Sequence, residues 1–338
     1  MKRYARWAKV LYGWKINKSV DALCPPEEVF LEITNTCNFK CSYCPHAEPN
    51  HFLEVSPATM SPDDVLLLLG KLRDGGVTTS AIHLNIDGEP FMNRRIDQIC
   101  SAAISKGWNT FIFATNGYYA SAERVNALPA AGKDVRYLFT IDFCSDRVLF
   151  ERYRGGTGSW DVVRQNVHDL ISLDIPHVSI VMTDISSFVI TDRRELLSRY
   201  AALKQLFPDS KRLGFKTREF HDVTAYVTGQ VNGSHEHRKY NECPYPWTSI
   251  HIAANGDVIS CDRDLRHKNV LGNLFTENFS DIWNGEKYRR LRNAILEGDL
   301  ADMGACPFCD LPYDSSKFSL RHLAQVAVVR LGAFSMVD

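Results

Sequence analysis

Short β-branched runs alternate with longer amphipathic stretches along most of the chain, and this order limits the folds that the chain can adopt. Six apolar runs predict strands, at residues 28–34, 81–86, 109–115, 135–142, 177–183 and 213–219. Helices are predicted between them, at residues 61–76, 93–107, 121–132, 159–173 and 191–207. Strands that alternate with helices form a parallel sheet with right-handed crossovers. Six units are too few for a complete eight-stranded barrel, so the pattern leaves an open barrel and a doubly wound sheet as alternatives.

The sequence changes character after the sixth predicted strand. Residues 228–242 are polar, and the stretch PWTSIHIAANGDVIS that follows them predicts a β-hairpin around a two-residue turn at Asn255 and Gly256. We therefore expect a basic and aromatic extension (1–27), an α/β domain (28–227), a small α+β domain with a hairpin (228–315) and a C-terminal helix (316–338).

Charge and hydropathy exclude several classes of protein. The net charge of −1 argues against a dedicated nucleic-acid-binding protein. No apolar run approaches the roughly 18 residues that cross a bilayer, and the first residues lack the pattern of an export signal. The extension is amphipathic, and burial of its apolar face is favoured over contact with an anionic membrane. We expect a cytoplasmic protein that binds neither nucleic acid nor a membrane.

The ten cysteines are unevenly placed, and seven of them form two sets. The first set follows the first predicted strand and consists of Cys37, Cys41 and Cys44. The second set lies in the small domain and consists of Cys243, Cys261, Cys306 and Cys309. Clustered thiols in a reducing compartment indicate metal ligands rather than disulfides.

The sizes of the two sets indicate different kinds of metal site. Cysteine thiolates are the usual ligands of a cubane iron–sulfur cluster, so three of them leave one iron open, whereas four close the cluster. An open metal position is where chemistry takes place. The alternative is zinc, held by the first set with His46 as a fourth ligand and by the four thiols of the second set. Zinc is disfavoured at the first set because zinc ribbons pair two CxxC knuckles across a hairpin.

The C-x3-C-x2-C spacing, with the aromatic Tyr43 before its last cysteine, resembles the signature of radical S-adenosylmethionine (SAM) enzymes. The resemblance extends from residue 28 to about residue 220. It includes the motifs DGEP (87–90), TNG (115–117), TID (140–142) and RYRGGTGSWDVV (152–163), with Asp87 where the family usually has glycine. The resemblance implies a partial (β/α)6 TIM-like barrel. The segment from Cys243 to Cys309 is similar in sequence to the SPASM or twitch domain of many such enzymes.

The resemblance also implies cofactors and their ligands. A [4Fe-4S] cluster on the first set would bind the amino and carboxylate groups of SAM, and a second, fully ligated [4Fe-4S] cluster would occupy the second set. One electron would cleave SAM to methionine and a 5'-deoxyadenosyl radical, which would remove a hydrogen atom from the substrate. The residues implied to contact SAM are Tyr43, Gly88, Glu89, Thr115, Asn116, Asp142 and Arg154. The electron would come from a reducing partner such as flavodoxin or ferredoxin.

The reaction that this resemblance favours is a radical oxidation of a small molecule of the sugar, aminocyclitol or nucleoside type. Dehydrogenation, epimerisation, decarboxylation and carbon–carbon coupling all begin with the same hydrogen abstraction. A ribosomal-peptide or protein maturase of the same superfamily is the first alternative, although only 27 residues precede the first strand, too few for a leader-recognition module. A non-catalytic zinc-binding interaction module is the second.

Three further residues are candidates for contact with the substrate. Cys144 follows the fourth strand and could donate a hydrogen atom to a product radical, although an unreactive thiol is favoured. Lys216 and Arg218 share one face of the sixth strand. They would bind a carboxylate or phosphate of the substrate if that face is the inner one, or lie in solvent if it is not.

Overall fold

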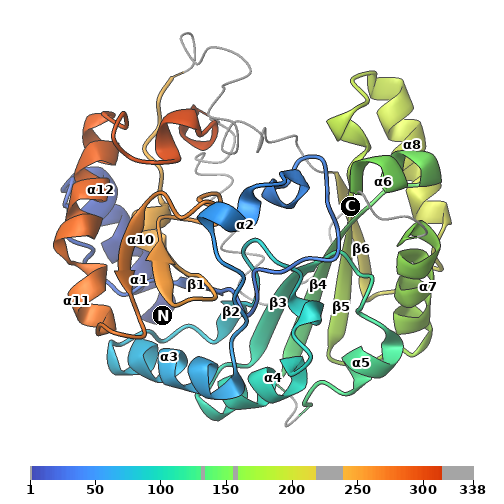
Figure 1. The fold of residues 1–338 in the computed structure, drawn as a ribbon, viewed down its shortest axis with the longest axis horizontal. Helices are drawn as coiled ribbons and strands as arrows, with labels where there is room; N and C mark the ends of the chain where they lie inside the picture. Colours follow the sequence, from blue (N-terminus) through green and yellow to red (C-terminus); the bar gives the residue numbers. More distant parts are fainter. Residues whose placement is uncertain (1, 131–133, 155–158, 218–238, 314–338) are drawn as a thin grey trace.

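The computed structural model describes residues 2–130, 134–154, 159–217 and 239–313 (Figure 1). The strands described there form one curved sheet in the order β6-β5-β4-β3-β2-β1-β7-β8-β9. Their bounds are β1 Glu28–Leu31, β2 Ala81–His83, β3 Thr110–Thr115, β4 Arg136–Phe143, β5 Val178–Asp184, β6 Leu213–Thr217, β7 Ser249–Ile252, β8 Asp257–Ile259 and β9 Val270–Asn273. Strands β1 to β6 are parallel neighbours, which confirms the partial barrel.

Helices cover the outer side of this sheet (Figure 1). The connections between the barrel strands contain α2 His51–Glu54, which does not belong to this outer layer, α3 Pro62–Asp74, α4 Ile96–Ser105, α5 Ala122–Asn126, α6 Arg147–Arg154, α7 Ser159–Ser172 and α8 Arg193–Gln205. Ser61 begins α3 with a capping box to Asp64, as its sequence indicates. The cap of α8 is Asp192, whose carboxylate accepts from the Glu195 amide at 2.8 Å. Helix α6 was not predicted.

The barrel strands bury one face and leave the other partly open. Along β4 burial alternates at every residue, as expected where one face meets helices and the other lines the barrel interior. Phe111, Phe113 and Phe139 are fully buried on the outer face. On the inner face Asp142 pairs in register with Thr183, which pairs with Lys216. Residues at this inner edge therefore come from three neighbouring strands.

The second domain extends the barrel sheet instead of forming a sheet of its own. Strand β7 runs parallel to β1 with Phe30 opposite His251, and β7 and β8 form the predicted hairpin. The turn has three residues rather than two, because Ala253 donates to the Asp257 carbonyl at 2.8 Å and Gly256 has a positive φ of 85°. The remaining helices are α10 Tyr245–Thr248, α11 Phe279–Trp283 and α12 Glu286–Glu297. The predicted C-terminal helix and the boundary at residue 228 lie outside the described residues.

The N-terminal extension packs on the second domain. It forms α1 (Lys2–Leu11) and the π-helix η1 (Tyr12–Ile16), and Trp14 stacks on Trp247 with ring centroids 5.9 Å apart. Lys15 forms an ion pair with Glu242 at 3.0 Å. Among the described residues, no helix combines the length and hydropathy that a membrane-spanning segment needs.

Candidate functional site

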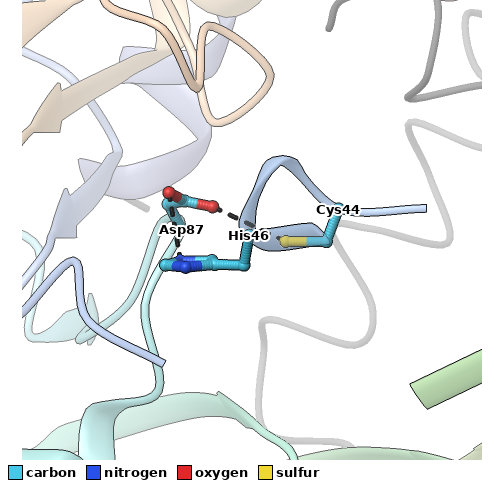
Figure 2. Close-up of side chains that lie close together, drawn as sticks. All are labelled: Cys44, His46 and Asp87. Carbon is cyan, nitrogen blue, oxygen red and sulfur yellow. Dashed lines mark hydrogen bonds and ion pairs between the residues drawn. The ribbon is translucent and has the colours of Figure 1, made fainter. Parts of the chain in front are cut away.

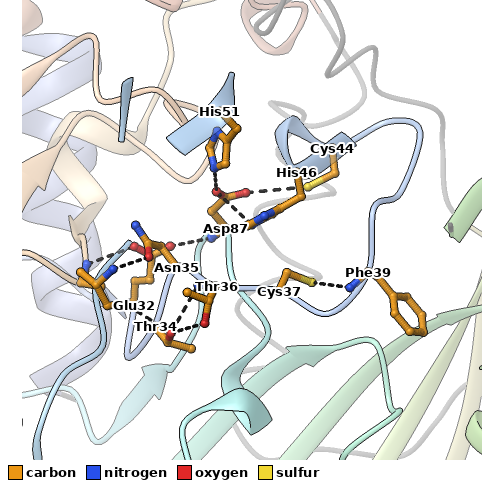
Figure 3. Close-up of polar contacts among 12 residues, drawn as sticks. Glu32, Thr34, Asn35, Thr36, Cys37, Phe39, Cys44, His46, His51 and Asp87 are labelled. Atoms are coloured by element: carbon orange, nitrogen blue, oxygen red, sulfur yellow. Dashed lines mark hydrogen bonds and ion pairs between the residues drawn. The ribbon is translucent and has the colours of Figure 1, made fainter. Parts of the chain in front are cut away.

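The first cysteine set lies in the loop that follows β1 (Figure 3). The Cys44 amide donates to the Cys41 carbonyl at 2.9 Å, which folds the loop, and the Ser42 amide donates to the Tyr153 carbonyl of α6 at 2.9 Å. The Cys37 sulfur accepts from the Phe39 amide at 3.4 Å and lies 3.9 Å from the Asn116 side-chain nitrogen. Backbone contacts thus hold the three thiols at the carboxyl edge of the barrel.

The donor chemistry of this set suits an iron–sulfur cluster. Burial raises the pKa of Cys37 to about 12, with a further contribution from the Glu89 carboxylate. Burial also raises the pKa of Cys44 well above its usual value, and Asp87 and Cys41 add to the shift. Thiols gathered in this way become thiolates only when a cation compensates their charge, and a metal centre supplies one. The three cysteines therefore fit a cluster with one position left for SAM.

The zinc alternative involves His46, which has another partner. Among the described residues, Cys44, His46 and Asp87 form a compact group whose ligand atoms lie within 4.8 Å of one another, and this group includes neither Cys37 nor Cys41 (Figure 2). The Asp87 carboxylate pairs with His46 at 3.3 Å and with His51 at 2.8 Å. His46 thus pairs with a carboxylate, and of the three thiols only that of Cys44 belongs to its group.

Asp87 is anchored by a second buried carboxylate, that of Glu32. Glu32 accepts from the Asp87 amide at 2.8 Å through Oε1 and from the Ala254 amide at 3.0 Å through Oε2 (Figure 3). Ala254 belongs to the β7–β8 turn, so one side chain ties the DGEP motif to the second domain. Burial, with the nearby Asp87 charge, raises the pKa of Glu32 to about 7. Sequence analysis missed both Glu32 and His51, because their partners lie in distant segments.

Glu89 organises the edge of the barrel by binding the TNG motif. Its carboxylate accepts from the Thr115 hydroxyl at 2.7 Å and from the Asn116 amide at 2.6 Å. The Asn116 side chain then donates to Asn38 in the cysteine loop at 2.8 Å. Burial raises the pKa of Glu89, although the hydrogen bonds from Thr115 and Asn116 oppose this shift. The structure brings Glu89, Thr115 and Asn116 together with Cys37, as the motifs predict.

Arg154, Tyr43 and Asp142 form a second group beside the cysteine loop. Arg154 is 6% exposed; it donates to the Tyr43 hydroxyl at 2.6 Å and lies 3.5 Å from the Asp142 carboxylate. The Cys41 thiol donates to the Arg154 carbonyl at 3.6 Å. Burial opposes the charge of the guanidinium, but Cys41, Tyr43 and Asp142 together hold its pKa above the ordinary value. A fixed positive charge therefore lies next to the thiols.

Gly88 occupies a position where no larger residue fits. A Cβ at this residue would lie 2.2 Å from the Thr34 carbonyl oxygen and 2.8 Å from the Asn35 backbone, neither of which can rotate away.

We expect Gly88→Ala to displace the DGEP motif, raise the dissociation constant for SAM at least tenfold and lower the melting temperature by roughly 4–8 °C, a cost of about 2 kcal/mol. Gly70→Ala, where the Cβ meets only Lys106 atoms at 3.8–3.9 Å, is the control in α3. Unchanged SAM binding in Gly88→Ala would contradict this role.

The second cysteine set also gathers, although its members come from distant segments. Burial raises the pKa of Cys243 to about 12, and the charge of Cys309 raises it further. Burial likewise raises the pKa of Cys261, and Cys306 and Cys309 add to it. Arg263 lies 3.7 Å from the Cys309 sulfur, and Asn269 lies 3.7 Å from the Cys306 sulfur. Cys243, Cys261 and Cys306 are each near enough to another thiol of the set for its charge to raise their pKa, and amide and guanidinium donors lie beside two of the sulfurs, so the donor set fits a fully ligated cluster.

A layer of stacked rings connects the barrel interior to the second domain. Phe30 stacks on His83 of β2 with centroids 4.0 Å apart and on His251 of β7 at 4.4 Å, and Tyr245 lies 5.7 Å from His251. Burial lowers the pKa of His251 to about 3. Burial also lowers that of His83 to about 4, with a partial offset from Asp262. Both imidazoles are therefore neutral at pH 7.

The two histidines should make the protein sensitive to acid. Their pKa values in the folded state lie below the unfolded value of about 6.5, so the unfolded state binds more protons as the pH falls below 6.5. The free energy of unfolding should then decrease by about 1.4 kcal/mol per pH unit for each histidine, down to about pH 4 for His83 and about pH 3 for His251. Glu32 acts in the opposite direction between about pH 7 and its unfolded pKa.

The His251→Phe variant has one titrating imidazole fewer than the wild type. We therefore expect the free energy of unfolding of this variant to fall less steeply than that of the wild type between pH 6.5 and 4. Urea unfolding at several pH values measures the difference, and the contribution of Glu32 cancels in the comparison. His168→Phe, an exposed position on α7, should follow the wild type. Equal slopes for His251→Phe and the wild type would contradict the assignment.

The remaining candidate residues lie in different environments. Cys144 is 0% exposed; its thiol donates to the Asp146 carbonyl at 3.3 Å, and burial raises its pKa to about 12. Cys144 is thus a buried residue of the core. Lys216 is exposed and pairs in register with Thr183 at the inner edge. Arg218 lies outside the described residues.

Comparison with known families agrees with this geometry. The family model described as the radical SAM superfamily matches residues 31–199, half of the chain. The model of an iron-sulfur cluster-binding domain, SPASM, matches residues 243–310. The protein belongs to the radical SAM superfamily and is an enzyme whose cofactors are SAM and iron–sulfur clusters.

The similar proteins differ in what they bind. A curated relative, the SAM-dependent 2-deoxy-scyllo-inosamine dehydrogenase of Niallia circulans, is 29% identical over 68 residues, which cover 20% of this chain and only 27% of that protein. BtrN in complex with AdoMet and 2-DOIA has a TM-score of 0.53 at 17% identity, over 84% of this chain and 93% of its own. AdoMet-bound anSMEcpe has a TM-score of 0.57 at 14% identity, over 91% and 94%.

A third similar structure, SuiB of Streptococcus suis bound to the precursor peptide SuiA, has a TM-score of 0.50 at 18% identity, over 86% of this chain and 70% of its own. At these identities the three structures support the fold alone.

Proposed function

We propose that this enzyme oxidises a hydroxylated small molecule of the sugar, aminocyclitol or nucleoside type by removing a hydrogen atom from carbon. The observation that carries the proposal is the second set of four thiols, which belongs to a domain whose strand β7 pairs with β1, the strand that precedes the first set. A fully ligated cluster beside a SAM site suits a net two-electron oxidation. The match to a dehydrogenase supports this reading.

Each group of residues has a task in this proposal. Cys37, Cys41 and Cys44 hold the SAM-binding cluster, and Cys243, Cys261, Cys306 and Cys309 hold the second. When bound, SAM and the clusters supply a 5'-deoxyadenosyl radical and an acceptor for the electron that the substrate loses. Gly88 allows the DGEP backbone to approach Thr34 closely, and Glu89 fixes Thr115 and Asn116 at the edge where SAM binds. Arg154, held by Tyr43 and Asp142, places a positive charge there.

A maturase that acts on a ribosomal peptide or a protein is the second candidate. It is favoured by the likeness to SuiB, whose structure contains a precursor peptide. In that case Lys216, exposed at the inner edge of β6, would contact an acidic group of the peptide. In both cases a small electron-transfer protein such as flavodoxin or ferredoxin would supply the first electron.

The two candidates are separated by anaerobic turnover with both classes of substrate. We expect the reconstituted enzyme with dithionite to form 5'-deoxyadenosine slowly without substrate and faster with aminocyclitols or sugars. Mass spectrometry should then detect a product that has lost two hydrogen atoms, in proportion to the 5'-deoxyadenosine. Stimulation by peptides encoded near the gene, and not by polyols, would overturn the small-molecule proposal.

A further inference from the structure

Both oxygens of the buried Glu32 carboxylate accept hydrogen bonds from backbone amides of distant segments. Oε1 accepts from the Asp87 amide of the DGEP motif at 2.8 Å (Figure 3). Oε2 accepts from the Ala254 amide of the β7–β8 turn at 3.0 Å. The Glu32 residue is 1% exposed, and its own amide donates to the Ile252 carbonyl of β7 at 2.8 Å. Glu32 therefore holds two segments at one point, directly after the end of β1.

An ionised glutamate is the side chain that matches this pair of donors. A carboxylate only accepts, at both of its oxygens, whereas a glutamine has one accepting oxygen and an NH2 group that donates. A glutamine in place of Glu32 would turn its NH2 group toward one of the two backbone N–H groups and leave that N–H without an acceptor. Because a buried charge is costly unless its hydrogen bonds are made, the presence of a carboxylate here indicates that both bonds matter.

The hydrogen bond from the Asp87 amide is one of two that flank Gly88. On the other side of Gly88, the Glu89 amide donates to the Thr36 carbonyl at 2.9 Å. Between these two bonds a Cβ on Gly88 would lie 2.2 Å from the backbone of the loop that follows β1. The close approach of the DGEP backbone to this loop is thus held at one end by the main chain and at the other end by the charge of Glu32.

We propose that Glu32 is a positioning residue for SAM, and that its charge holds the DGEP backbone in the place where SAM binds. Glu32 acts through the Asp87 amide, and the Ala254 amide keeps the carboxylate turned toward Asp87 by occupying its second oxygen. This inference deepens the proposed function and rests on its placement of SAM at the DGEP motif. It holds for either class of substrate.

A role in joining the two domains does not explain the second hydrogen bond of Glu32. The pairing of β1 with β7 already joins the barrel to the second domain through the backbone. Lys71 of α3 adds to this contact, because its ammonium group donates to the carbonyls of Leu274 and Phe275 at 2.7 and 3.0 Å. The bond from the Asp87 amide lies within the barrel domain, so it contributes to the SAM site and not to the contact between domains.

The test is a calorimetric titration of the cluster-loaded enzyme with SAM, without reductant, so that SAM is not consumed. Glu32→Gln keeps the size of the side chain and removes one acceptor. Glu32→Asp keeps the charge but is one methylene shorter, and it is the second variant in case Glu32→Gln does not fold. Glu27→Gln is the matched control, because Glu27 is also buried and paired, with Arg6 at 2.7 Å, but precedes β1 instead of following it.

We expect Glu32→Gln to raise the dissociation constant for SAM at least tenfold, and Glu32→Asp at least threefold, because each loses an amide partner. Under dithionite the KM for SAM should rise in proportion, while iron content and kcat for 5'-deoxyadenosine formation stay within about twofold of the wild type. Glu27→Gln should bind SAM as the wild type does.

A purely structural role would instead lower the melting temperature and kcat and leave the affinity for SAM unchanged. That result in Glu32→Gln, or in Glu32→Asp if Glu32→Gln does not fold, would overturn this inference and leave the proposed function intact. Failure of the wild type to bind SAM would overturn both.

Discussion

Replacing Cys37, Cys41 and Cys44 together with alanine is expected to abolish SAM cleavage and to halve the iron content. With two cubane clusters the reconstituted wild type should hold about eight irons, and the triple variant about four, because the second set keeps its own four thiols. SAM cleavage under dithionite should fall to background, since the variant has no iron at which SAM can bind. Iron and sulfide assays with measurement of 5'-deoxyadenosine test both expectations.

The control for this variant is the double substitution Cys24→Ala and Cys100→Ala. Both thiols are buried in the core, outside the two sets, so their loss removes packing and no ligand. The double variant should keep the wild-type iron content and rate of SAM cleavage. If instead the triple variant kept all of its iron, or if wild type and variant bound zinc with little iron, the assignment of Cys37, Cys41 and Cys44 would be wrong.

The sequence predicts the barrel well because the signal for it is local. Each strand from β1 to β6 overlaps a predicted run, since apolar periodicity and β-branched residues report the burial of that segment alone. Helix α6 was missed, because the residues RVLFERYR form only about two turns, too short for a helical period to stand out, and bury only Phe150 and Arg154. The three-residue turn at Gly256 could not be told from a two-residue turn, because it depends on the register of β7 and β8.

The contacts of the site likewise fall into two kinds, those that local sequence motifs predict and those that join distant segments of the chain. The DGEP and TNG motifs predict that Glu89, Thr115 and Asn116 meet, because each follows a strand of one parallel sheet. The pairing of Glu32 with Ala254, 222 positions later, has no counterpart in any sequence pattern. His251 likewise looks like one residue of an alternating strand, and only the parallel pairing of β7 with β1 brings it to Phe30. The sequence does offer one signal for Glu32, because it is a charged residue within the otherwise apolar run that precedes the cysteine loop.

The second set of cysteines should separate SAM cleavage from oxidation of the substrate. Replacing Cys243 and Cys309 with alanine removes two of the four thiols, which come from distant segments, so the second cluster cannot remain closed. Iron should fall from about eight to about four, as in the first variant, but the SAM site, with Glu89 and Arg154, is left intact.

We therefore expect the Cys243→Ala, Cys309→Ala variant to keep forming 5'-deoxyadenosine while the oxidised product falls at least a hundredfold, because no acceptor is left for the substrate's electron. Deuterium transfer from labelled substrate into 5'-deoxyadenosine shows whether the hydrogen atom is still removed. Asn269→Ala is a milder companion, since its amide lies 3.7 Å from the Cys306 sulfur and does not replace a ligand. Undiminished product in the double variant would show that the second set serves the fold alone, and the proposed oxidation would then need another electron acceptor.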